Sequence, residues 1–456
     1  MGEAHVLSGE QLSAYSLDAE TPVAAVFPAD EREAAEVARV ANARRVAVVV
    51  WGGGTKQDVE PVQPRDGIVL ATSRLNSTIE LDAANLTVTV GAGRVLDDLQ
   101  RELAEARLFL PLDPIDSVRS TVGGSLAANS SGPSRLLYRT ARDLVLGLHV
   151  VTPTGKTIRV GGKTVKDVAG YDLKKLYIGS WGTLGAITQA TFRLLPLPEA
   201  RATVVMVFRE LSNTCATVLA LLASFLRPST ADLLSYGAMP SPTEEALRLQ
   251  PGEYLLLVAV EGAFEAVERQ KRELLEMATR HGARDAAVLE GTEEAQLWQQ
   301  RRQLFTGLSA GRSVVLLKGS VPLKRVFDFC SGLLSVQRDQ KLQVSMASHA
   351  GNGIVYGLLA SEMAQTGVLE SAAERLQQLA ADCGGFAVVQ RAPREVVRRL
   401  KLWPPRNDYG VMRRIKRQLD PYNLWSPART PGGPLAEEEL QPAVALSTTQ
   451  TPEGRG

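Results

Sequence analysis

The sequence predicts an α+β protein built from two large domains, and three observations support this fold class. A chain of 456 residues is too long for one hydrophobic core, so two or three domains are expected. Short β-branched segments alternate with helical patterns along most of the chain. A proline cluster at 196–198 marks the point where one alternation ends and another begins.

The first region opens with a β-α-β pattern. Residues 23–27 and 46–50 are apolar strand segments, and between them Asp30 precedes an amphipathic helix over 31–43. Three short β-branched segments then predict a meander of strands, at 69–71, 79–82 and 87–90.

An irregular stretch follows a helix that ends near residue 107. Residues 111–132 are rich in Gly, Ser, Asn and Pro, and an irregular stretch of this length inside a domain is usually functional. Strand patterns return at 144–151, 157–160 and 186–195.

The second region fits an α+β sheet with helices on one face. The strand segments are 204–208, 254–261, 313–320, 344–347 and 354–359. The helical segments are 211–225, 264–281, 323–338 and 369–383. A short basic helix is expected over 410–418, and the Pro-, Gly-, Glu- and Thr-rich sequence beyond residue 427 predicts disorder.

Composition excludes several classes of protein. The net charge of +1 provides no overall field for nucleic acid or an anionic membrane, and no apolar run is long enough for a membrane span. The start of the chain lacks the pattern of a signal peptide. Cys215, Cys330 and Cys383 are too widely spaced for an iron–sulfur cluster, a zinc ribbon or a disulfide framework. A reduced, cytoplasmic protein is therefore expected.

Residues Gly52-Gly53-Gly54-Thr55 directly follow a strongly apolar strand. Glycines allow several backbone N–H groups to point toward one phosphate, so this turn predicts a pyrophosphate site, although a plain tight turn is the alternative. Lys56 does not complete a Walker A loop, because the spacing is wrong. Gly91 and Gly93 do not form a Rossmann fingerprint, since Leu96 stands at the third glycine position.

Two further blocks of small residues follow. Residues 111–129 offer bare backbone to a long cofactor, although a loop and a packed alanine-rich helix would give the same pattern. Residues 163–173 precede the second block, Gly179-Ser180-Trp181-Gly182-Thr183-Leu184-Gly185-Ala186-Ile187-Thr188.

With these blocks in order, the chain resembles the vanillyl-alcohol-oxidase-type (PCMH-type) FAD-binding superfamily, and within it the glycolate oxidase and D-lactate dehydrogenase group. The resemblance is strong over residues 20–200, and residues 415–427 resemble the usual end segment of the group. It implies a two-subdomain FAD-binding domain (1–200) and an α+β cap domain with an antiparallel sheet (201–395). A segment returning to the FAD domain (396–430) and a disordered tail (431–456) complete the expected organisation.

The resemblance also implies the cofactor and its contacts. The implied pyrophosphate contacts are Gly52, Gly53, Gly54 and Thr55, and the isoalloxazine contacts are Pro111, Leu112 and Asp113. The ribityl, phosphate and adenosine contacts are Thr121, Gly123, Gly124, Ala127 and Asn129, and the adenine contacts are Gly185 and Ile187. Asp167 and Tyr171 line the pocket or are structural. Because Thr55 stands where some members attach the flavin to a histidine, FAD is expected to be non-covalent.

The match weakens on the substrate side. The group carries two histidines seven residues apart and a later Glu-His-Gly triplet, but this chain has His349 followed by Tyr356, and Gln390-Arg391 in place of the triplet. Glutamine brings no charge to a metal and arginine is a poor base, so no metal site is expected. His349, Tyr356 and Arg301 are the catalytic candidates; His349 has a structural alternative, and Arg301 either faces a substrate carboxylate or is a solvated helix residue.

This combination resembles the smaller FAD-binding subunit of bacterial glycolate oxidases. The resemblance implies a small 2-hydroxy acid substrate, a second FAD subunit and an iron–sulfur partner, with the chain in the cytoplasm or peripheral at the inner face of the membrane through partners. Basic residues at 398–401 and 413–417 form a solvated face or dock a partner. Two other hypotheses remain: a self-sufficient FAD dehydrogenase of another alcohol, aldonolactone or hydroxy acid, and a flavoprotein that carries electrons or supports assembly without turnover.

Overall fold

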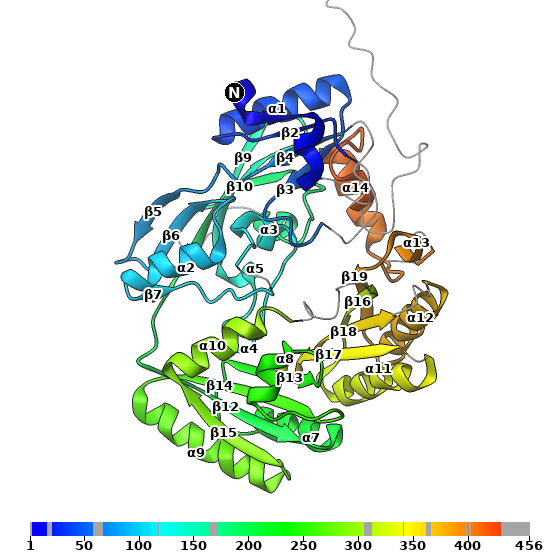
Figure 1. Cartoon of the computed structure of the whole chain (residues 1–456). Helices are drawn as coiled ribbons and strands as arrows, with labels where there is room; N and C mark the ends of the chain where they lie inside the picture. Colours follow the sequence, from blue (N-terminus) through cyan, green and yellow to red (C-terminus); the bar gives the residue numbers. More distant parts are fainter. Residues whose placement is uncertain are drawn as a thin grey trace, which may run out of the picture.

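The computed structural model describes residues 2–15, 21–57, 67–115, 118–163, 171–304, 312–340, 342–361, 366–397, 399–400 and 403–429 (Figure 1). The expected tail, 431–456, and Asp167 lie outside the described residues. The chain is a mixed α+β protein, as predicted, with an upper part that contains the N-terminus and a lower part built on one large sheet.

The upper part begins with a four-stranded sheet in the order β1-β2-β4-β3. Its strands are β1 (Val6–Leu7), β2 (Ala24–Val26), β3 (Val48–Trp51) and β4 (Ile68–Ala71), with 3-10 turns η1 (Glu3–His5) and η2 (Gly9–Tyr15). Helix α1 (Glu31–Arg44) begins where the Asp30 carboxylate accepts the N–H of Glu33 at 2.8 Å, and it buries a row of alanines. The predicted β-α-β unit is confirmed.

The predicted meander is wrong at its first strand. β4 pairs in parallel with both β2 and β3, whereas β5 (Thr78–Asp82) and β6 (Thr87–Gly91) form a hairpin in a second sheet. A short β-branched segment such as β4 can join a parallel or an antiparallel sheet, so its sequence does not show to which of the two sheets it belongs.

The second sheet of the upper part is antiparallel, with the order β5-β6-β10-β8-β9. Its remaining strands are β8 (Val145–Val151), β9 (Thr157–Gly161) and β10 (Ala186–Arg193). Helix α3 (Val122–Ala127) packs on β10. The other elements are α2 (Leu96–Glu105), β7 (Leu108–Phe109), α4 (Arg135–Tyr138), α5 (Ala141–Leu144), α6 (Lys174–Tyr177) and β11 (Leu195–Pro196), which pairs with β7.

The lower part is an eight-stranded antiparallel sheet in the order β15-β12-β14-β13-β17-β18-β16-β19. The strands are β12 (Ala200–Phe208), β13 (Thr230–Ser235), β14 (Tyr254–Gly262), β15 (Asp285–Glu290), β16 (Ser313–Ser320), β17 (Gln343–His349), β18 (Ile354–Ser361) and β19 (Phe386–Arg391). One face is covered by α7 (Leu211–Ala223), α9 (Phe264–Arg280), α11 (Val326–Gln340) and α12 (Thr366–Asp382). The opposite face carries α8 (Ser241–Ala246) and α10 (Gly291–Arg301) and points toward the upper part.

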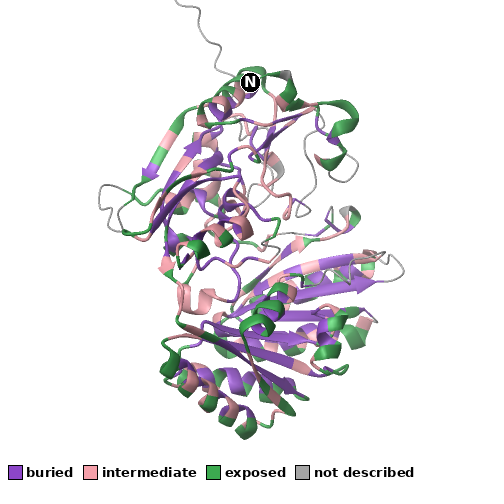
Figure 2. Ribbon diagram, turned by 60° about the vertical axis from the view of Figure 1, so that its left-hand side comes forward, coloured by how far each residue is buried: buried purple, intermediate pink, exposed green. Residues whose placement is uncertain are grey.

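This sheet consists of two equivalent halves. β12–β15 and β16–β19 each have the internal strand order 4-1-3-2, and their second strands, β13 and β17, meet edge to edge. In the six inner strands, alternate residues belong to different hydrophobic clusters above and below the sheet, so these strands are buried on both faces (Figure 2). The sequence analysis missed β13, whose register places Asp232 opposite His349.

The C-terminal segment returns to the upper part. Helices α13 (Arg394–Val397) and α14 (Tyr409–Leu419) precede a stretch that pairs with β3, where the N–H of Val48 donates to Leu424 O at 2.8 Å. The buried Lys416 ammonium donates to Thr183 O at 2.8 Å, to Trp425 O at 2.7 Å and to Asp420. The 3-10 turn η6 (Pro427–Arg429) follows, and within the described ranges no helix combines the length and apolarity needed to cross a membrane.

Candidate functional site

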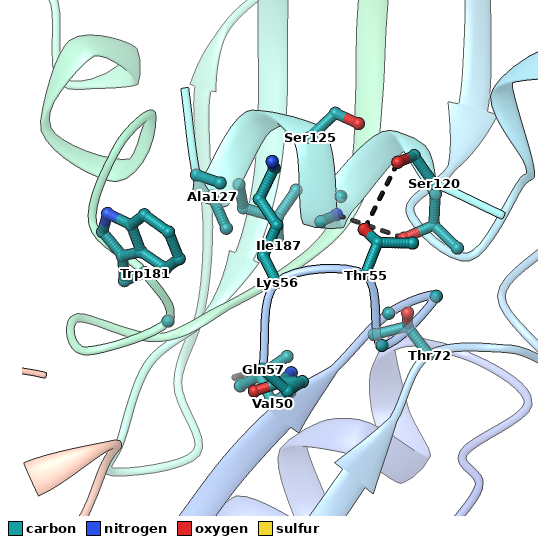
Figure 3. Close-up of a pocket in the computed structure, with 18 of the residues that line it drawn as sticks. Val50, Thr55, Lys56, Gln57, Thr72, Ser120, Ser125, Ala127, Trp181 and Ile187 are labelled. Atoms are coloured by element: carbon teal, nitrogen blue, oxygen red, sulfur yellow. Dashed lines mark hydrogen bonds between the residues drawn. The ribbon is translucent and has the colours of Figure 1, made fainter. Parts of the chain in front are cut away.

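A cradle of small residues lies between the two sheets of the upper part (Figure 3). The turn after β3, the start of α3 and the turn before β10 form its walls. Its lining includes Val50, Gly52, Gly53, Gly54, Thr55, Lys56, Gln57, Thr72, Ser120, Thr121, Gly123, Gly124, Ser125, Ala127, Trp181, Gly185, Ile187 and Arg429. Ten of the expected cofactor contacts are therefore together in one cavity.

The first wall requires glycine. A Cβ at Gly53 would lie 1.8 Å from Arg119 O, and a Cβ at Gly52 would lie 2.3 Å from Thr121 Oγ1. Among the described residues, no protein acceptor receives the N–H groups of Gly53 and Gly54. These donors are available to an anion, as the sequence predicted for this turn.

One buried hydroxyl group on the cradle wall has no hydrogen-bond partner among the described residues. Ser125 Oγ is buried and, within the described residues, has no hydrogen-bond partner, and Thr55 Oγ1 lies 3.3 Å from Ser120 Oγ. Since an unpaired buried hydroxyl destabilises a fold by roughly 1–3 kcal/mol, such groups indicate a polar ligand. The cradle thus fits the pyrophosphate and ribityl parts of FAD.

The opposite wall is the turn before β10. Gly185 has φ of +147°, and a Cβ there would lie 2.6 Å from Val151 O, so only glycine fits. Ile187 is buried on β10 and lines the cradle, as does Trp181, which sequence reasoning did not include.

Sequence reasoning also missed the contribution of the C-terminal segment. Arg429 lines the cradle, and its guanidinium donates to the Gln57 side chain, whose Nε2 donates to Val50 O at 3.2 Å. Arg429 is far from the other lining residues in the sequence, so no local spacing identifies it as a cradle residue. Only the resemblance of residues 415–427 to the end segment of the group indicates that this region returns to the cofactor site.

Several expected contacts do not lie in the cradle. Tyr171 is 94% exposed and is not part of the cradle lining. Asn129 is outside the lining, where it adopts a φ of +45° after α3. Pro111, Leu112 and Asp113 line a different cavity, and the Asp113 carboxylate accepts the N–H groups of Gly132 and Ser134 at 3.1 Å.

That second cavity, of about 340 Å³, lies between the upper part and the large sheet. Its walls are Pro111–Asp113 and Tyr138 from the upper part, and Trp298 and Arg301 from α10 of the lower part. The structure therefore joins the segment expected near the isoalloxazine to one of the expected catalytic residues.

Arg301 and His349 share one carboxylate at the joint of the two half-sheets. Arg301 Nε donates to Asp232 Oδ2 at 2.7 Å, and His349 Nδ1 lies 2.8 Å from Asp232 Oδ1. All three side chains are fully buried. Arg301 is thus not a solvated helix residue. Asp232, which was not among the predicted site residues, holds both Arg301 and His349 through its carboxylate.

The charge states of this cluster follow from burial and pairing. Burial alone would raise the pKa of Asp232, but the positive charge of Arg301 and the hydrogen bonds from Arg301 and His349 outweigh burial and lower that pKa. Burial lowers the pKa of His349 despite the neighbouring carboxylate, so the imidazole is neutral near pH 7. A neutral ring that donates from Nδ1 to Asp232 has its lone pair on Nε2.

Two polar atoms of this cluster have no partner among the described residues: His349 Nε2 and Arg301 Nη1 are both buried and unpaired. One is a proton acceptor and the other a cationic donor. Buried groups of this kind are normally satisfied by a ligand or an ordered water.

Tyr356 adjoins the cluster on β18. Its ring is 5.4 Å from the His349 ring in an edge-on arrangement, and burial raises the pKa of its hydroxyl. Lys318, opposite Tyr356 on β16, has its Nζ 5.8 Å from the Tyr356 ring. The positive charges of Lys56, Arg301 and Arg135 oppose this effect of burial on the Tyr356 pKa without outweighing it.

The position expected for the triplet of the group lies at the sheet edge. Gln390 and Arg391 end β19, and Arg391 is exposed. Among the residues that the structure describes, no three His, Cys, Asp or Glu side chains are grouped to hold a metal ion.

Comparison with known proteins shows two family models on this chain. Residues 22–161 match the FAD binding domain, and residues 197–388 match the C-terminal domain of FAD linked oxidases. The "Glycolate oxidase subunit GlcD" of Bacillus subtilis is 28% identical over 91% of both chains. An FAD-linked oxidoreductase of Mycobacterium tuberculosis is 30% identical over 94% of this chain and 96% of its own. D-lactate dehydrogenases and a D-2-hydroxyglutarate dehydrogenase show 26–28% identity.

Solved structures share the fold. The structure of p-cresol methylhydroxylase aligns with a TM-score of 0.73 and 16% identity, covering 94% of both chains. This confirms the PCMH-type architecture that the sequence predicts.

Proposed function

Because the chain belongs to the FAD-linked oxidoreductases of the glycolate oxidase and D-lactate dehydrogenase type, we propose that it oxidises a small 2-hydroxy acid with FAD held in the cradle. The observation that carries the proposal is the pair of unpaired buried atoms, Arg301 Nη1 and His349 Nε2. One matches the carboxylate of such an acid and the other its hydroxyl.

The cradle residues hold the cofactor in this proposal. The N–H groups of Gly53 and Gly54 and the hydroxyl of Thr55 would bind the pyrophosphate. Ser125 would donate to a ribityl or phosphate oxygen, and Gly185 and Ile187 would border the adenine. With threonine at position 55, the flavin stays non-covalent. When bound, FAD supplies the hydride acceptor.

Arg301 and His349 position and deprotonate the substrate. The planar guanidinium of Arg301, fixed by Asp232, presents Nη1 to the α-carboxylate. Nε2 of the neutral His349 accepts the hydroxyl proton as the α-hydrogen leaves as hydride. Asp232 holds the imidazole through Nδ1 and stabilises the imidazolium that forms. Tyr356 closes the site beside the imidazole.

Electrons then leave through partners. The relative named as a glycolate oxidase subunit supports a multi-subunit assembly, which we propose contains a second FAD subunit and an iron–sulfur subunit. Cys215, Cys330 and Cys383 are buried and free, so they do not provide ligands for a cluster. An iron–sulfur centre must then come from another chain.

The test is spectroscopic. The purified chain is expected to be yellow, to release its flavin into the supernatant on acid precipitation, and to lose absorbance near 450 nm, roughly the flavin maximum, with glycolate or a related acid. His349→Gln should keep the yellow colour and lose the bleaching. A colourless chain that takes up no added FAD contradicts the proposal.

Two alternatives remain within the same experiment. The first is a self-sufficient dehydrogenase of another hydroxy acid, which is favoured by the D-lactate and D-2-hydroxyglutarate dehydrogenases among the relatives. In that case the flavin of the isolated chain would be bleached by that acid, and the chain would reduce an artificial electron acceptor without partners. A yellow chain that no 2-hydroxy acid bleaches, and that co-purifies with a cysteine-rich partner, would instead be an electron carrier or assembly subunit.

A further inference from the structure

Three charged side chains share one wall of the cavity between the upper part and the large sheet. Arg201 Nε, on β12, lies 2.9 Å from Glu294 Oε1 on α10 and 3.7 Å from Glu261 Oε2 on β14. The side chains of Glu261 and Glu294 are only 5% and 9% exposed, whereas that of Arg201 is 39% exposed. One guanidinium therefore serves two buried carboxylates, which leaves this wall with an excess of negative charge.

Hydrogen bonds from both parts of the molecule hold these two carboxylates in place. The Tyr138 hydroxyl, on α4 of the upper part, donates to Glu261 Oε1 across the junction of the two parts (Figure 1). Burial and this hydrogen bond raise the pKa of Tyr138, so its hydroxyl remains a donor. Thr203 Oγ1 donates to Glu294 Oε1 at 2.9 Å and accepts the indole N–H of Trp298 at 2.9 Å. Glu261 and Glu294 are thus fixed on the wall of the cavity.

The other two guanidinium groups of the cavity lining also have carboxylate partners. Arg301 is bound by Asp232 at 2.7 Å, and Arg302 Nη1 lies 3.9 Å from Asp97 Oδ1 on α2. Arg301 keeps one unpaired donor, Nη1, which the proposed function assigns to the α-carboxylate of the substrate. Among the described residues that line this cavity, no cation is left for a second carboxylate of the ligand.

The remaining wall of the cavity is apolar. The upper part contributes the run Leu108-Phe109-Leu110-Pro111-Leu112 together with Leu96 and Leu197, and the lower part contributes the ring of Trp298. The volume of about 340 Å³ lies within the range of pockets that bind small molecules, roughly 300–1,000 Å³. Glycolate has no side chain that could fill such a space.

We propose that this cavity receives the side chain of the 2-hydroxy acid, and that Glu261 and Glu294 select an uncharged, apolar side chain and reject one that ends in a carboxylate. The inference rests on the proposed function, because Arg301 both lines the cavity and carries the unpaired donor for the α-carboxylate. A second carboxylate in the cavity would face two carboxylates that share one cation, and like charges in a poorly solvated space repel each other. A branched alkyl group would instead bury its surface against the apolar wall.

The experiment uses two acids of matched shape that have no hydroxyl group to oxidise. In 5-methylhexanoate an isopropyl group stands where glutarate has its second carboxylate. Calorimetric titration of FAD-loaded wild type, Glu261→Gln and Glu294→Gln gives the dissociation constant of each acid. Glutamine removes the charge but keeps an oxygen that accepts the hydrogen bond from Tyr138 or Thr203. Glu293→Gln, the exposed neighbour of Glu294 on α10, is the matched control.

Wild type should bind 5-methylhexanoate at least about tenfold more tightly than glutarate. Glu261→Gln and Glu294→Gln should each tighten glutarate at least about tenfold, because Arg201 is then no longer shared by two carboxylates. The same variants should change the affinity for 5-methylhexanoate less than about twofold. Glu293→Gln should leave both affinities as they are in wild type.

Three results would overturn the inference: a wild type that does not discriminate between the acids, a wild type that binds neither, or a glutarate affinity that both variants leave unchanged. The proposed function survives any of these if glycolate still bleaches the flavin. A wild-type chain that takes up no FAD overturns the proposed function, and this inference with it. The flavin content of each variant is measured first, so that a folding defect is recognised. If one variant fails to fold, the other decides the question, because Glu261 and Glu294 lie on different elements.

Discussion

Asp232 and His349 lie opposite each other in the register of β13 and β17, with Oδ1 of the carboxylate 2.8 Å from Nδ1 of the ring. The same carboxylate binds Arg301, so one acid at the joint of the half-sheets fixes both proposed substrate-binding groups. The free energy of unfolding and the rate of substrate oxidation are therefore both expected to depend on the Asp232 side chain.

Asp232→Asn tests this dependence. The substitution leaves the Arg301 guanidinium buried without its anion, and removing one partner of a buried pair typically costs about 3–5 kcal/mol of unfolding free energy. Urea unfolding measures the loss. Asp339→Asn removes an exposed pair with Arg375 and should have little effect, so equal losses in both variants would contradict the role of Asp232.

Acidification should destabilise the protein in two steps. His349 has a folded-state pKa below its ordinary value of 6.5, so the unfolded chain binds a proton first and stability falls as the pH drops below about 6.5. Asp232 also has a lowered pKa, which adds a second loss as the pH falls below its ordinary value of 3.8.

Chemical unfolding at a series of pH values measures both steps. His349→Gln should flatten the curve between about pH 6.5 and 5 and leave the acid step in place. His281→Gln, which removes a histidine at the end of α9, is the control substitution. A wild-type stability that is constant down to pH 5 would show that His349 is not held neutral.

Gly53→Ala should abolish or weaken FAD binding. The added methyl group would meet Arg119 O at 1.8 Å, so the turn must move and its N–H groups lose their common direction. Hydrogen bonds to charged groups contribute about 1.5–3 kcal/mol each, which corresponds to a loss of roughly tenfold to hundredfold in affinity. Flavin fluorescence titration measures it. Gly367→Ala, where a Cβ meets nothing within 4 Å, should bind FAD like wild type.

Arg429→Ala should also weaken FAD binding, by roughly tenfold, since it removes a cation from the cradle and a partner of Gln57. The same titration serves, and thermal unfolding with and without FAD gives an independent measure. Arg414→Ala, an exposed residue of α14, is the control. If Arg429→Ala binds FAD with unchanged affinity, Arg429 does not contact the cofactor and its role is structural.

The positions of the helices were predicted best from the sequence, and the pairings between strands that are distant in the sequence were predicted least well. α1, α9 and α12 were expected within three residues of their observed ends, because their apolar spacing and their boundary residues are local signals. The glycine turn at 52–55 was recognised because only a backbone site needs consecutive glycines there.

Asp232 shows why the rest of the site could not be predicted. Its partners are 69 and 117 residues away, and an acid within the short apolar strand β13 gives no local sign of which strand will lie beside it. Arg429 is similar, since its place in the cradle is set by the return of the C-terminal segment to β3.

The pairing of residues 424–426 with Val48, together with the position of Arg429, has a consequence for biosynthesis. The walls of the cradle lie within residues 50–187, but Arg429 joins its lining only after the C-terminal segment has been made and has paired with Val48. Nascent chains and fragments that stop before Lys416 should therefore bind FAD more weakly than the full chain.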